Sequence, residues 1–362
     1  MTDTPQPILS VRNLKTYFFP DEGIVKALDG ATFDVFPGQT LGIVGESGCG
    51  KSVAARSILR IVERPGRIVE GEILFHRDGA DGRARDVDLA KLDGDGKEMR
   101  ATRGADIALI FQEPMTSFSP VHTIGNQIVE AIKLHRAVSP KQARERAIDL
   151  LRRVGISRPE QRIDEYPYQL SGGLRQRAMI AMALACDPKV LIADEPTTAL
   201  DVTTQAQILD LLRGLQEQNH MAIMLITHNL GVVAEMAQDV VVMYLGRVVE
   251  KGPVDAIFHA PKHPYTQALL RSLPSVDAPA RIKLPTLTGS IPHPQNRPLG
   301  CPFHPRCPAF MPGICDKNDP LLLPVEPGHD VSCFLYHRDG TPVEANGHDN
   351  GVTTSPIVMA DH

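Results

Sequence analysis

The sequence predicts an α/β fold built around a phosphate-binding loop, and three observations lead to it. A short apolar strand, a glycine-rich loop and a helix follow one another over residues 40–60. Further apolar strands end in polar residues, which is where open α/β sheets place ligand contacts. Around this core we expect an antiparallel β subdomain before the loop, a helical subdomain at about 115–180, and a C-terminal extension rich in cysteine and proline.

Composition limits the function classes that remain open. At 362 residues the chain can hold a sizeable core, and its formal net charge of −5 gives no support to a nucleic-acid partner. No apolar run approaches the roughly 20 residues that cross a bilayer, and the N-terminus lacks the features of a signal peptide. We therefore expect a cytosolic chain that associates with a membrane only through a partner.

The glycine-rich loop fits the phosphate-binding pattern G-x-x-x-x-G-K-[ST] in the stretch Gly45-Glu46-Ser47-Gly48-Cys49-Gly50-Lys51-Ser52. Glycines let backbone N–H groups crowd the phosphates of a nucleotide, while the following helix points its N-terminus at them. Lys51 would reach the outer phosphates and Ser52 would ligate magnesium. The loop therefore predicts a nucleotide site.

Residues 8–45 alternate apolar and polar positions, broken by glycine and proline, which predicts a short antiparallel sheet leading into the loop. Tyr17-Phe18-Phe19 within it is an aromatic triplet. These rings could stack on a purine or could form a core strand, and the residues alone leave both interpretations open. A further strand is expected at 71–75, followed over 76–103 by a solvated loop with one short helix.

Three apolar runs are predicted to be buried strands, at residues 106–111, 190–194 and 222–227. The first ends at Gln112. The second ends in Asp194 and Glu195, two acids that are costly at a core strand unless they meet a cation or activate water. Asp194 would orient magnesium and Glu195 would act as general base. His228, which ends the third run, is expected beside Gln112 and Glu195, and this position favours a catalytic over a structural role.

The helical region carries two cap signals. Ser139-Pro140-Lys141-Gln142 is a capping box with proline at the first helical position, and Gly155 ends that helix. Ser171 is a natural N-cap for a second helix that opens with Gly172 and Gly173. Two glycines and a serine at a helix N-terminus form a second potential phosphate site.

Taken together, these motifs resemble the ATP-binding cassette (ABC) family over roughly residues 8–270, with Walker A loop, Q-loop, L-S-G-G signature, Walker B strand, D-loop and H-loop in order. The resemblance implies ATP and Mg²⁺ as ligands. It assigns Phe18 to stacking on adenine, with Tyr17 as the neighbouring possibility. It also implies that Gln112 contacts magnesium or the lytic water and that His228 contacts the terminal phosphate. Phosphate and magnesium binding would fall to Gly45, Glu46, Ser47, Gly48, Cys49, Gly50, Lys51 and Ser52.

In this family each ATP lies between two cassettes. The resemblance therefore implies that Ser171, Gly172 and Gly173 act on ATP bound by the opposite subunit, with Asp201 of the D-loop beside them. The chain carries one cassette, so a second ATPase subunit is implied, either another copy or a paralogue.

Within the family the chain is most similar to the ATPase subunits of oligopeptide and dipeptide importers. The similarity rests on Phe111-Gln112-Glu113-Pro114-Met115-Thr116-Ser117, on His263-Pro264-Tyr265-Thr266, and on the run from Gly300 to Pro308. It implies two transmembrane permease subunits, a solute-binding protein outside the cell, and a peripheral position on the cytoplasmic face of the plasma membrane. One departure is Phe118-Ser119-Pro120, where that subfamily usually has Leu-Asn-Pro, near the surface expected to touch the membrane subunits.

The last third of the chain changes composition, since 18 of the 30 prolines follow residue 250. We expect a cassette over residues 1–275, an extension over 276–345 and a flexible tail over 346–362. The extension holds Cys301, Cys307, Cys315 and Cys333, and four clustered cysteines in a reducing cytosol suggest metal rather than disulfides. Their spacing is wider than that of zinc ribbons, and the subfamily resemblance implies a 4Fe–4S cluster. The alternative is four free thiols.

The leading hypothesis is the ATP-hydrolysing subunit of a bacterial importer for peptides or a related solute. An alternative is a soluble cassette ATPase acting on ribosomes or nucleic acid, but such relatives carry two cassettes or a long coiled coil, and neither is present. A third possibility is a regulatory module that holds ATP without hydrolysing it. The presence of Glu195, Gln112 and His228 argues against that role.

Overall fold

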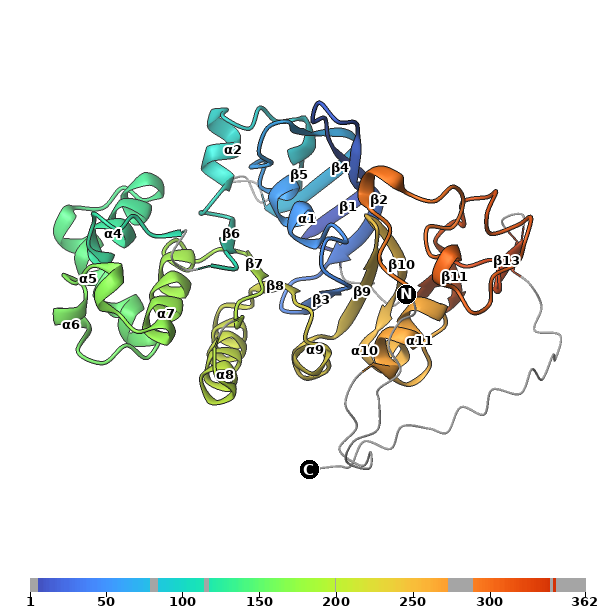
Figure 1. The fold of residues 1–362 in the computed structure, drawn as a ribbon. Helices are drawn as coiled ribbons and strands as arrows, with labels where there is room; N and C mark the ends of the chain where they lie inside the picture. Colours follow the sequence, from blue (N-terminus) through green and yellow to red (C-terminus); the bar gives the residue numbers. More distant parts are fainter. Residues whose placement is uncertain are drawn as a thin grey trace.

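The computed structural model describes residues 6–342 except 79–83, 114–116, 199, 273–288 and 339–340 (Figure 1). The predicted boundary between cassette and extension at 275/276 and the predicted tail at 346–362 lie outside these residues, as do Pro114, Met115 and Thr116 of the peptide-importer resemblance. The described part contains an antiparallel sheet of four strands, a mixed sheet of eight, and a pair of short strands, β13 (His337–Arg338) and β14 (Thr341–Pro342).

The four-stranded sheet has the order β2-β1-β4-β5 and confirms the predicted antiparallel region. Its inner face is apolar because alternate positions of β1 and β2 are buried, as the period of two requires. Tyr17 pairs with Lys26 and Phe18 with Val25 at one end of the β1–β2 ladder. The strands are β1 (Leu9–Phe18), β2 (Val25–Val35), β4 (Gly66–Asp78) and β5 (Ala84–Asp88).

The solvated loop predicted over 76–103 is wrong in its first part. Strand β4 continues to Asp78, and β5 pairs with it, Phe75 opposite Val87. Sequence patterning missed β5 because it is an edge strand of mostly charged residues, and Val87 is the one buried hydrophobic side chain among those described in it. The predicted short helix is present as α2 (Lys97–Thr102), after a 3₁₀ turn η1 (Leu89–Lys91).

The eight-stranded sheet has the order β11-β12-β10-β9-β3-β8-β7-β6. Strands β9, β3, β8, β7 and β6 run parallel, so their carboxyl ends lie at one edge. Every residue of β3, β7 and β8 is buried, which explains why these strands read as continuous apolar runs. The strands are β3 (Thr40–Val44), β6 (Ile107–Ile110), β7 (Val190–Asp194), β8 (Ala222–Ile226), β9 (Asp239–Tyr244), β10 (Arg247–Pro253), β11 (Leu323–Glu326) and β12 (His329–Val331).

Helix α1 (Lys51–Ile58) starts at the end of β3 and belongs to the core shared by the two sheets. Its inward residues Ala54, Ala55 and Ile58 have no exposed surface. Small side chains at two of these positions let the helix approach the strands closely. The amino end of α1, which carries the phosphate loop, is therefore held in place by packing on both sheets.

The predicted helical region packs on the β6 side of the sheet, drawn in green in Figure 1. The capping box is confirmed: the Ser139 N–H donates to Gln142 Oε1 at 2.9 Å and the Gln142 N–H donates to Ser139 Oγ at 3.3 Å. In the peptide-importer departure, Phe118 is 4% exposed and lies in this core, so only its neighbours face solvent. The elements are α4 (Ile124–His135), α5 (Pro140–Arg153), α6 (Pro159–Arg162), η2 (Pro167–Gln169) and α7 (Gly172–Ala183).

The C-terminal extension continues the large sheet. Strand β12 pairs antiparallel with β10, Glu250 opposite Val331, and β11 pairs with β12. Phe303 packs between Tyr244 of β9 and Tyr265, with ring centroids 5.3 and 5.4 Å apart. The remaining elements are α8 (Val202–Asn219), α9 (Leu230–Met236), α10 (Val254–His259), α11 (Pro264–Arg271), η3 (Pro294–Asn296) and η4 (His304–Arg306).

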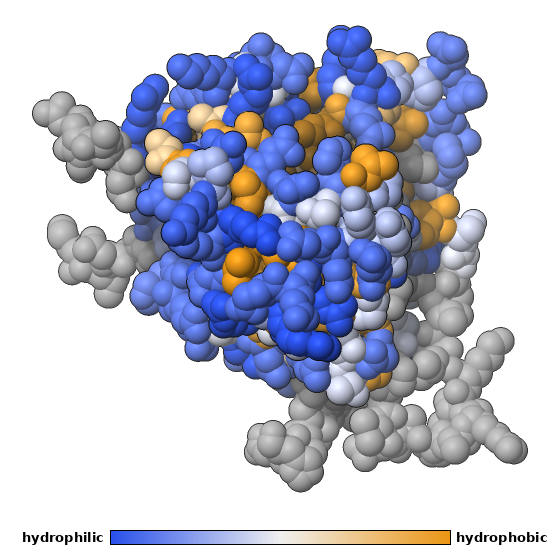
Figure 2. Space-filling view, turned by 90° about the vertical axis from the view of Figure 1, so that its left-hand side faces the viewer, coloured by the Kyte–Doolittle hydropathy of each residue, from blue (hydrophilic) through white to orange (hydrophobic). Residues whose placement is uncertain are grey.

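The surface on the helical side is largely hydrophilic, with apolar residues in separate small patches (Figure 2). Isolated exposed apolar residues of this kind are normal for folded proteins. Within the ranges that the structure describes, no helix combines the length and apolar character needed to span a membrane.

Candidate nucleotide site

The loop between β3 and α1 requires glycine at two positions. Gly45 has φ +151°, and a Cβ there would lie 2.2 Å from the backbone oxygen of Met243. Gly50 has φ +102°, and a Cβ there would lie 2.3 Å from the backbone oxygen of Ala27. The loop backbone is thus pressed against β9 and β2, which fixes the direction of its N–H groups.

Lys51 and Ser52 begin α1 and both line the pocket beside the loop. The Lys51 ammonium donates to the backbone oxygens of Gly45, at 2.8 Å, and Glu46, at 3.1 Å. Ser52 Oγ donates to Asp194 Oδ1 at 3.0 Å, which joins the loop to the end of β7. A hydroxyl and a carboxylate oxygen at this distance fit a hard cation such as Mg²⁺.

Three predicted catalytic residues meet at the carboxyl edge of the sheet. Gln112 Nε2 donates to Glu195 Oε2 at 3.2 Å, and His228 Nδ1 lies 3.1 Å from Glu195 Oε1. Thr198 Oγ1 also donates to Glu195 Oε2, at 2.7 Å. Glu195 has φ +49°, a left-handed conformation that is strained for a glutamate and typical of functional positions.

Asp194 at the end of β7 and Glu195 directly after it have pKa values shifted in opposite directions. Burial acts to raise the pKa of Glu195, but hydrogen bonds from Thr198 and His228 hold it below its ordinary value. Burial raises the pKa of Asp194, against the hydrogen bond from Ser52. Glu195 is therefore ionised at neutral pH, as a general base must be, whereas a positive charge beside Asp194 would favour its ionised form.

The pocket gathers residues from the loop, the strand ends, β2 and the extension. Sequence reasoning missed Lys26 and Arg297, because neither lies in a recognisable motif. It also missed Thr198, although a hydroxyl three residues after Glu195 is the kind of residue that can position a carboxylate. The lining residues are Val25, Lys26, Ala27, Ser47, Gly48, Gly50, Lys51, Ser52, Val53, Gln112, Glu195, Leu245 and Arg297.

Neither predicted aromatic residue lines the pocket in this structure. The Phe18 ring lies against Gly66, where a Cβ would come within 2.6 Å of Phe18 Cε1. Tyr17, the alternative assignment, donates its hydroxyl to Asp29 Oδ1 at 2.6 Å and has Lys26 over its ring. Tyr17 is thus the aromatic residue connected to the pocket, through Asp29 and Lys26.

Other predicted loop residues point elsewhere. The Glu46 carboxylate is paired with Arg306 of the extension, with N–O distances of 2.8 and 3.1 Å. Cys49 is 3% exposed, and its burial raises the pKa of its thiol, in line with a packing role for the side chain. Any phosphate contact from these two residues must therefore come from their backbone.

The signature and D-loop residues lie beside each other and outside the pocket. Ser171 caps α7 by accepting from the Leu174 N–H, and Asp201 caps α8 by accepting from the Thr204 N–H at 3.0 Å. A Cβ on Gly173 would lie 3.1 Å from Thr204 Cγ2, so the two helix starts are in contact. This exposed pair of helix N-termini, which includes Gly172, is available to a partner.

The four cysteines of the extension converge without forming a metal site. In the described ranges, no three His, Cys, Asp or Glu side chains are grouped closely enough to hold a metal ion. The Cys301 N–H donates to the Cys315 backbone oxygen at 2.8 Å, which brings those two segments together. Burial raises the pKa of Cys301 to about 11 and of Cys333 to about 12. Buried thiols with backbone N–H donors fit a thiolate cluster chemically, but the arrangement itself gives the predicted cluster no support.

Comparison with known proteins supports the motif assignment. A family model described as "ABC transporter" matches residues 28–198, and one described as "Oligopeptide/dipeptide transporter, C-terminal region" matches residues 249–315. The chain is 49% identical to a probable peptide ABC transporter ATP-binding protein of Sinorhizobium fredii, over 90% of this chain and 94% of that protein.

Two further relatives have similar names. The chain is 48% identical to the oligopeptide transport ATP-binding protein AppD of Bacillus subtilis, covering 92% of this chain and 98% of that one. It is also 48% identical to the dipeptide transport ATP-binding protein DppD of Escherichia coli, covering 90% and 96%. Among solved structures, an ATP-binding cassette dimer in a post-hydrolysis state with ADP and Pi matches 68% of this chain and 98% of its own, with TM-score 0.59 and 27% identity.

Proposed function

The chain belongs to the ABC transporter family of ATPases, and from this premise we propose that it energises a bacterial importer of oligopeptides, dipeptides or a related solute. The observation that carries the ATPase assignment is the convergence of three contacts at one pocket. Ser52 contacts Asp194, and Glu195 contacts both Gln112 and His228. The solute class comes from the peptide-transport relatives.

ATP binding starts at the phosphate loop. Lys51 exchanges its contacts with two loop carbonyls for phosphate oxygens, which are stronger acceptors because they are charged. Backbone N–H groups of the loop and the N-terminus of α1 point at the same phosphates. Magnesium held at Ser52, Asp194 and Gln112 would neutralise part of the phosphate charge.

Hydrolysis depends on Glu195, which accepts a proton from the attacking water. Its ionised state at neutral pH suits this role, and Gln112 and His228 each contact one of its two oxygens. In the ATP-bound state these two side chains are freed to contact the water and the terminal phosphate. The strained backbone of Glu195 supports its assignment as a functional residue.

The second half of each site comes from another cassette. Ser171, Gly172 and Gly173 are on a surface beside Asp201 and away from the pocket of their own chain. A second ATPase subunit, identical or paralogous, would present the same surface to the bound ATP. Closure on ATP and reopening after hydrolysis would move the helical subdomain against the membrane subunits.

The remaining partners follow from the same assignment. Two transmembrane permease subunits and an extracytoplasmic solute-binding protein would complete the importer, which places this chain at the cytoplasmic face of the plasma membrane. A soluble ATPase acting on ribosomes or nucleic acid has no support from the relatives. We divide the chain into a cassette to about residue 275 and an extension from about 276.

For Cys301, Cys307, Cys315 and Cys333 we propose that the thiols bind a 4Fe–4S cluster, a proposal that rests on the subfamily resemblance. The cluster would contribute a bound negative charge and cross-link the extension. Anaerobic purification followed by iron and sulfide analysis tests it. Four irons per wild-type chain and none in the Cys301→Ser/Cys333→Ser variant are expected. Iron-free protein after reconstitution would overturn it.

The transporter assignment is tested by purifying the tagged chain from gently solubilised native membranes. Polytopic membrane proteins are expected to co-purify, and their identity names the system whose solute should be assayed. Recovery of ribosomes or nucleic acid with no membrane protein would overturn the importer assignment and leave the ATPase mechanism standing.

A further inference from the structure

The extension supplies one residue to the wall of the nucleotide pocket. Arg297 lines it together with Lys26 and Ala27 of β2 and with the phosphate loop. Figure 1 places β6 and β7, which precede Gln112 and Glu195, on one side of α1, and β2 with the extension on the other. Arg297 belongs to the extension and donates to Asp29 of β2, so it comes from the side away from these hydrolytic residues, where the nucleoside part of a bound nucleotide would lie.

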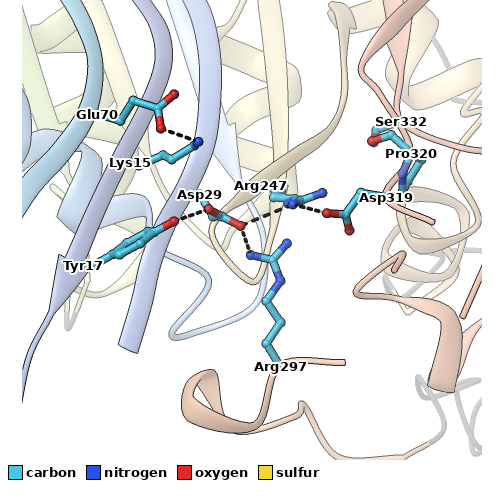
Figure 3. Close-up of polar contacts among 9 residues, drawn as sticks. All are labelled: Lys15, Tyr17, Asp29, Glu70, Arg247, Arg297, Asp319, Pro320 and Ser332. Carbon is cyan, nitrogen blue, oxygen red and sulfur yellow. Dashed lines mark hydrogen bonds and ion pairs between the residues drawn. The ribbon is translucent and has the colours of Figure 1, made fainter. Parts of the chain in front are cut away.

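Arg297 is held by a carboxylate that also organises its surroundings (Figure 3). Its Nη1 donates to Asp29 Oδ2 at 2.5 Å, while Tyr17 donates to the other oxygen of Asp29. Arg247 donates to Asp29 Oδ2 at 3.3 Å and to Asp319 Oδ2 at 2.8 Å. Burial acts to raise the pKa of Asp29, but Tyr17 and the two guanidinium groups hold it below its ordinary value.

The two arginines on Asp29 are not equivalent. Arg247 shares two carboxylates and does not line the pocket. Arg297 has Asp29 as its carboxylate partner and lines the pocket. Among the described residues, each arginine has one buried nitrogen without a hydrogen-bond partner, Nη2 of Arg297 and Nε of Arg247. Leaving a guanidinium N–H unsatisfied in a buried position is costly. Of these two arginines, Arg297 is the one that lines the pocket, so its guanidinium is the one that an acceptor of a bound ligand could satisfy.

The segment around Arg297 is anchored to the site a second time. Nine residues later, Arg306 is 4% exposed in its side chain and makes a two-pronged ion pair with Glu46 of the phosphate loop. Arg306 also donates to the Tyr244 hydroxyl at 3.3 Å. Arg297 thus lies on a segment fixed to the loop, so its guanidinium is preorganised rather than drawn in by the ligand.

We propose that Arg297 is a nucleotide-binding residue that the extension contributes, donating from its guanidinium to acceptors of the nucleoside, namely ribose hydroxyls or adenine ring nitrogens. The proposal deepens the ATPase assignment and rests on it. By linkage, a nucleotide that contacts Arg297 also stabilises the docked position of the extension. Asp29 acts as the positioning residue that aims the guanidinium.

The test is equilibrium binding of ADP to the full chain by calorimetry, since ADP is not hydrolysed. Arg297→Ala should weaken ADP binding about tenfold, the size expected for one charge-assisted hydrogen bond. Arg247→Ala is the matched control, because it removes a guanidinium from the same carboxylate without removing a pocket residue. It should change ADP affinity less than about twofold.

Inorganic triphosphate separates nucleoside contact from general charge. Its affinity should be the same for wild type and Arg297→Ala, because it lacks the nucleoside. Equal ADP binding by wild type and Arg297→Ala would overturn the proposal, as would an equal loss in Arg247→Ala. If Arg297→Ala does not fold, Arg297→Lys, which keeps the charge but loses the planar fork, must show reduced ADP affinity instead. A wild-type chain that binds no ADP would overturn the proposed function itself, a different outcome.

Discussion

The two walls of the nucleotide pocket are built in different ways. The hydrolytic wall is set by the carboxyl ends of buried parallel strands. Gln112 and Glu195 line the pocket after β6 and β7, and Asp194 of β7 and His228 after β8 contact Ser52 and Glu195 beside it. The opposite wall joins Asp29 to Arg297 across 268 residues of sequence. The first wall is a property of the sheet edge, whereas the second exists only when the extension has docked.

The difference separates the residues assigned to hydrolysis from those that hold the nucleotide pocket together on its other side. Strand ends give the hydrolytic residues a rigid scaffold, which preorganised catalysis requires. Ion pairs of Arg297 with Asp29 and of Arg306 with Glu46 tie the opposite wall to the extension. Substitutions on the hydrolytic wall should therefore reduce turnover, and substitutions on the opposite wall should reduce nucleotide affinity and stability.

The largest effect is expected for Glu195→Gln. Losing a general base typically lowers kcat by about 10²–10⁴. ADP affinity should change less than about threefold, because the amide keeps the size of the side chain and Thr198 remains beside it. Steady-state ATPase measurements with calorimetry check both values, and Glu217→Gln on the exposed face of α8 is the control. Unchanged turnover would remove Glu195 as the base.

Acidification should destabilise the chain at His263, a buried residue of the cassette whose ring lies against Phe303 of the extension. His263 is fully buried below Phe303, and burial lowers its pKa to about 4, opposed by the charge of Glu250. Its folded pKa lies below the unfolded value of about 6.5, so the stability from keeping it neutral is present above pH 6.5 and is lost as pH falls toward 4. The loss should reach about 2 kcal/mol at pH 5.

Urea unfolding at pH 7 and pH 5 measures this dependence. His263→Asn keeps the cap, since His263 Nδ1 accepts the Tyr265 N–H at 3.0 Å and asparagine is a good N-cap, but it removes the titration. Between pH 7 and pH 5, the free energy of unfolding should therefore fall less in His263→Asn than in the wild type. His220, which is exposed at the end of α8, gives the control His220→Asn. An equal pH slope in wild type and His263→Asn would contradict the prediction.

The next largest effect, on stability and on the KM for ATP, is expected when the ion pair between Arg306 and Glu46 is broken. Arg306→Met leaves the Glu46 carboxylate without its bidentate partner beside the phosphate loop, where it repels phosphate charge. We expect a loss of about 1–3 kcal/mol in stability and a rise in the KM for ATP with a small change in kcat. The double variant Arg306→Met/Glu46→Gln should recover most of the KM change. A double variant as impaired as the single one would indicate packing rather than charge.

Sequence reasoning identified the wall that depends on local order and missed the wall that depends on distant contacts. Lys51 and Glu195 were predictable because loop glycines and strand ends leave a pattern within a few residues. Arg297 and the partner of Glu46 left no such pattern, since each contact joins segments more than 200 residues apart. Strand β5 was missed for a related reason, because pairing with β4 rather than its own apolar pattern makes it a strand.

The smallest expected change in ADP affinity distinguishes Tyr17 from Phe18 as the aromatic residue that affects nucleoside binding. Tyr17→Leu should weaken ADP binding about two- to threefold, because Tyr17 holds Oδ1 of Asp29 at 2.6 Å and its loss disturbs the aim of Arg297. Arg247 lies farther from Asp29, at 3.3 Å, and is also paired with Asp319, so its loss should disturb Asp29 less. Phe18→Leu should lower stability while leaving ADP affinity within about twofold, because the Phe18 ring packs on Gly66 outside the pocket. Calorimetry on both variants decides between them. A larger loss of ADP affinity in Phe18→Leu than in Tyr17→Leu would restore Phe18 as the stacking residue that the family resemblance implies.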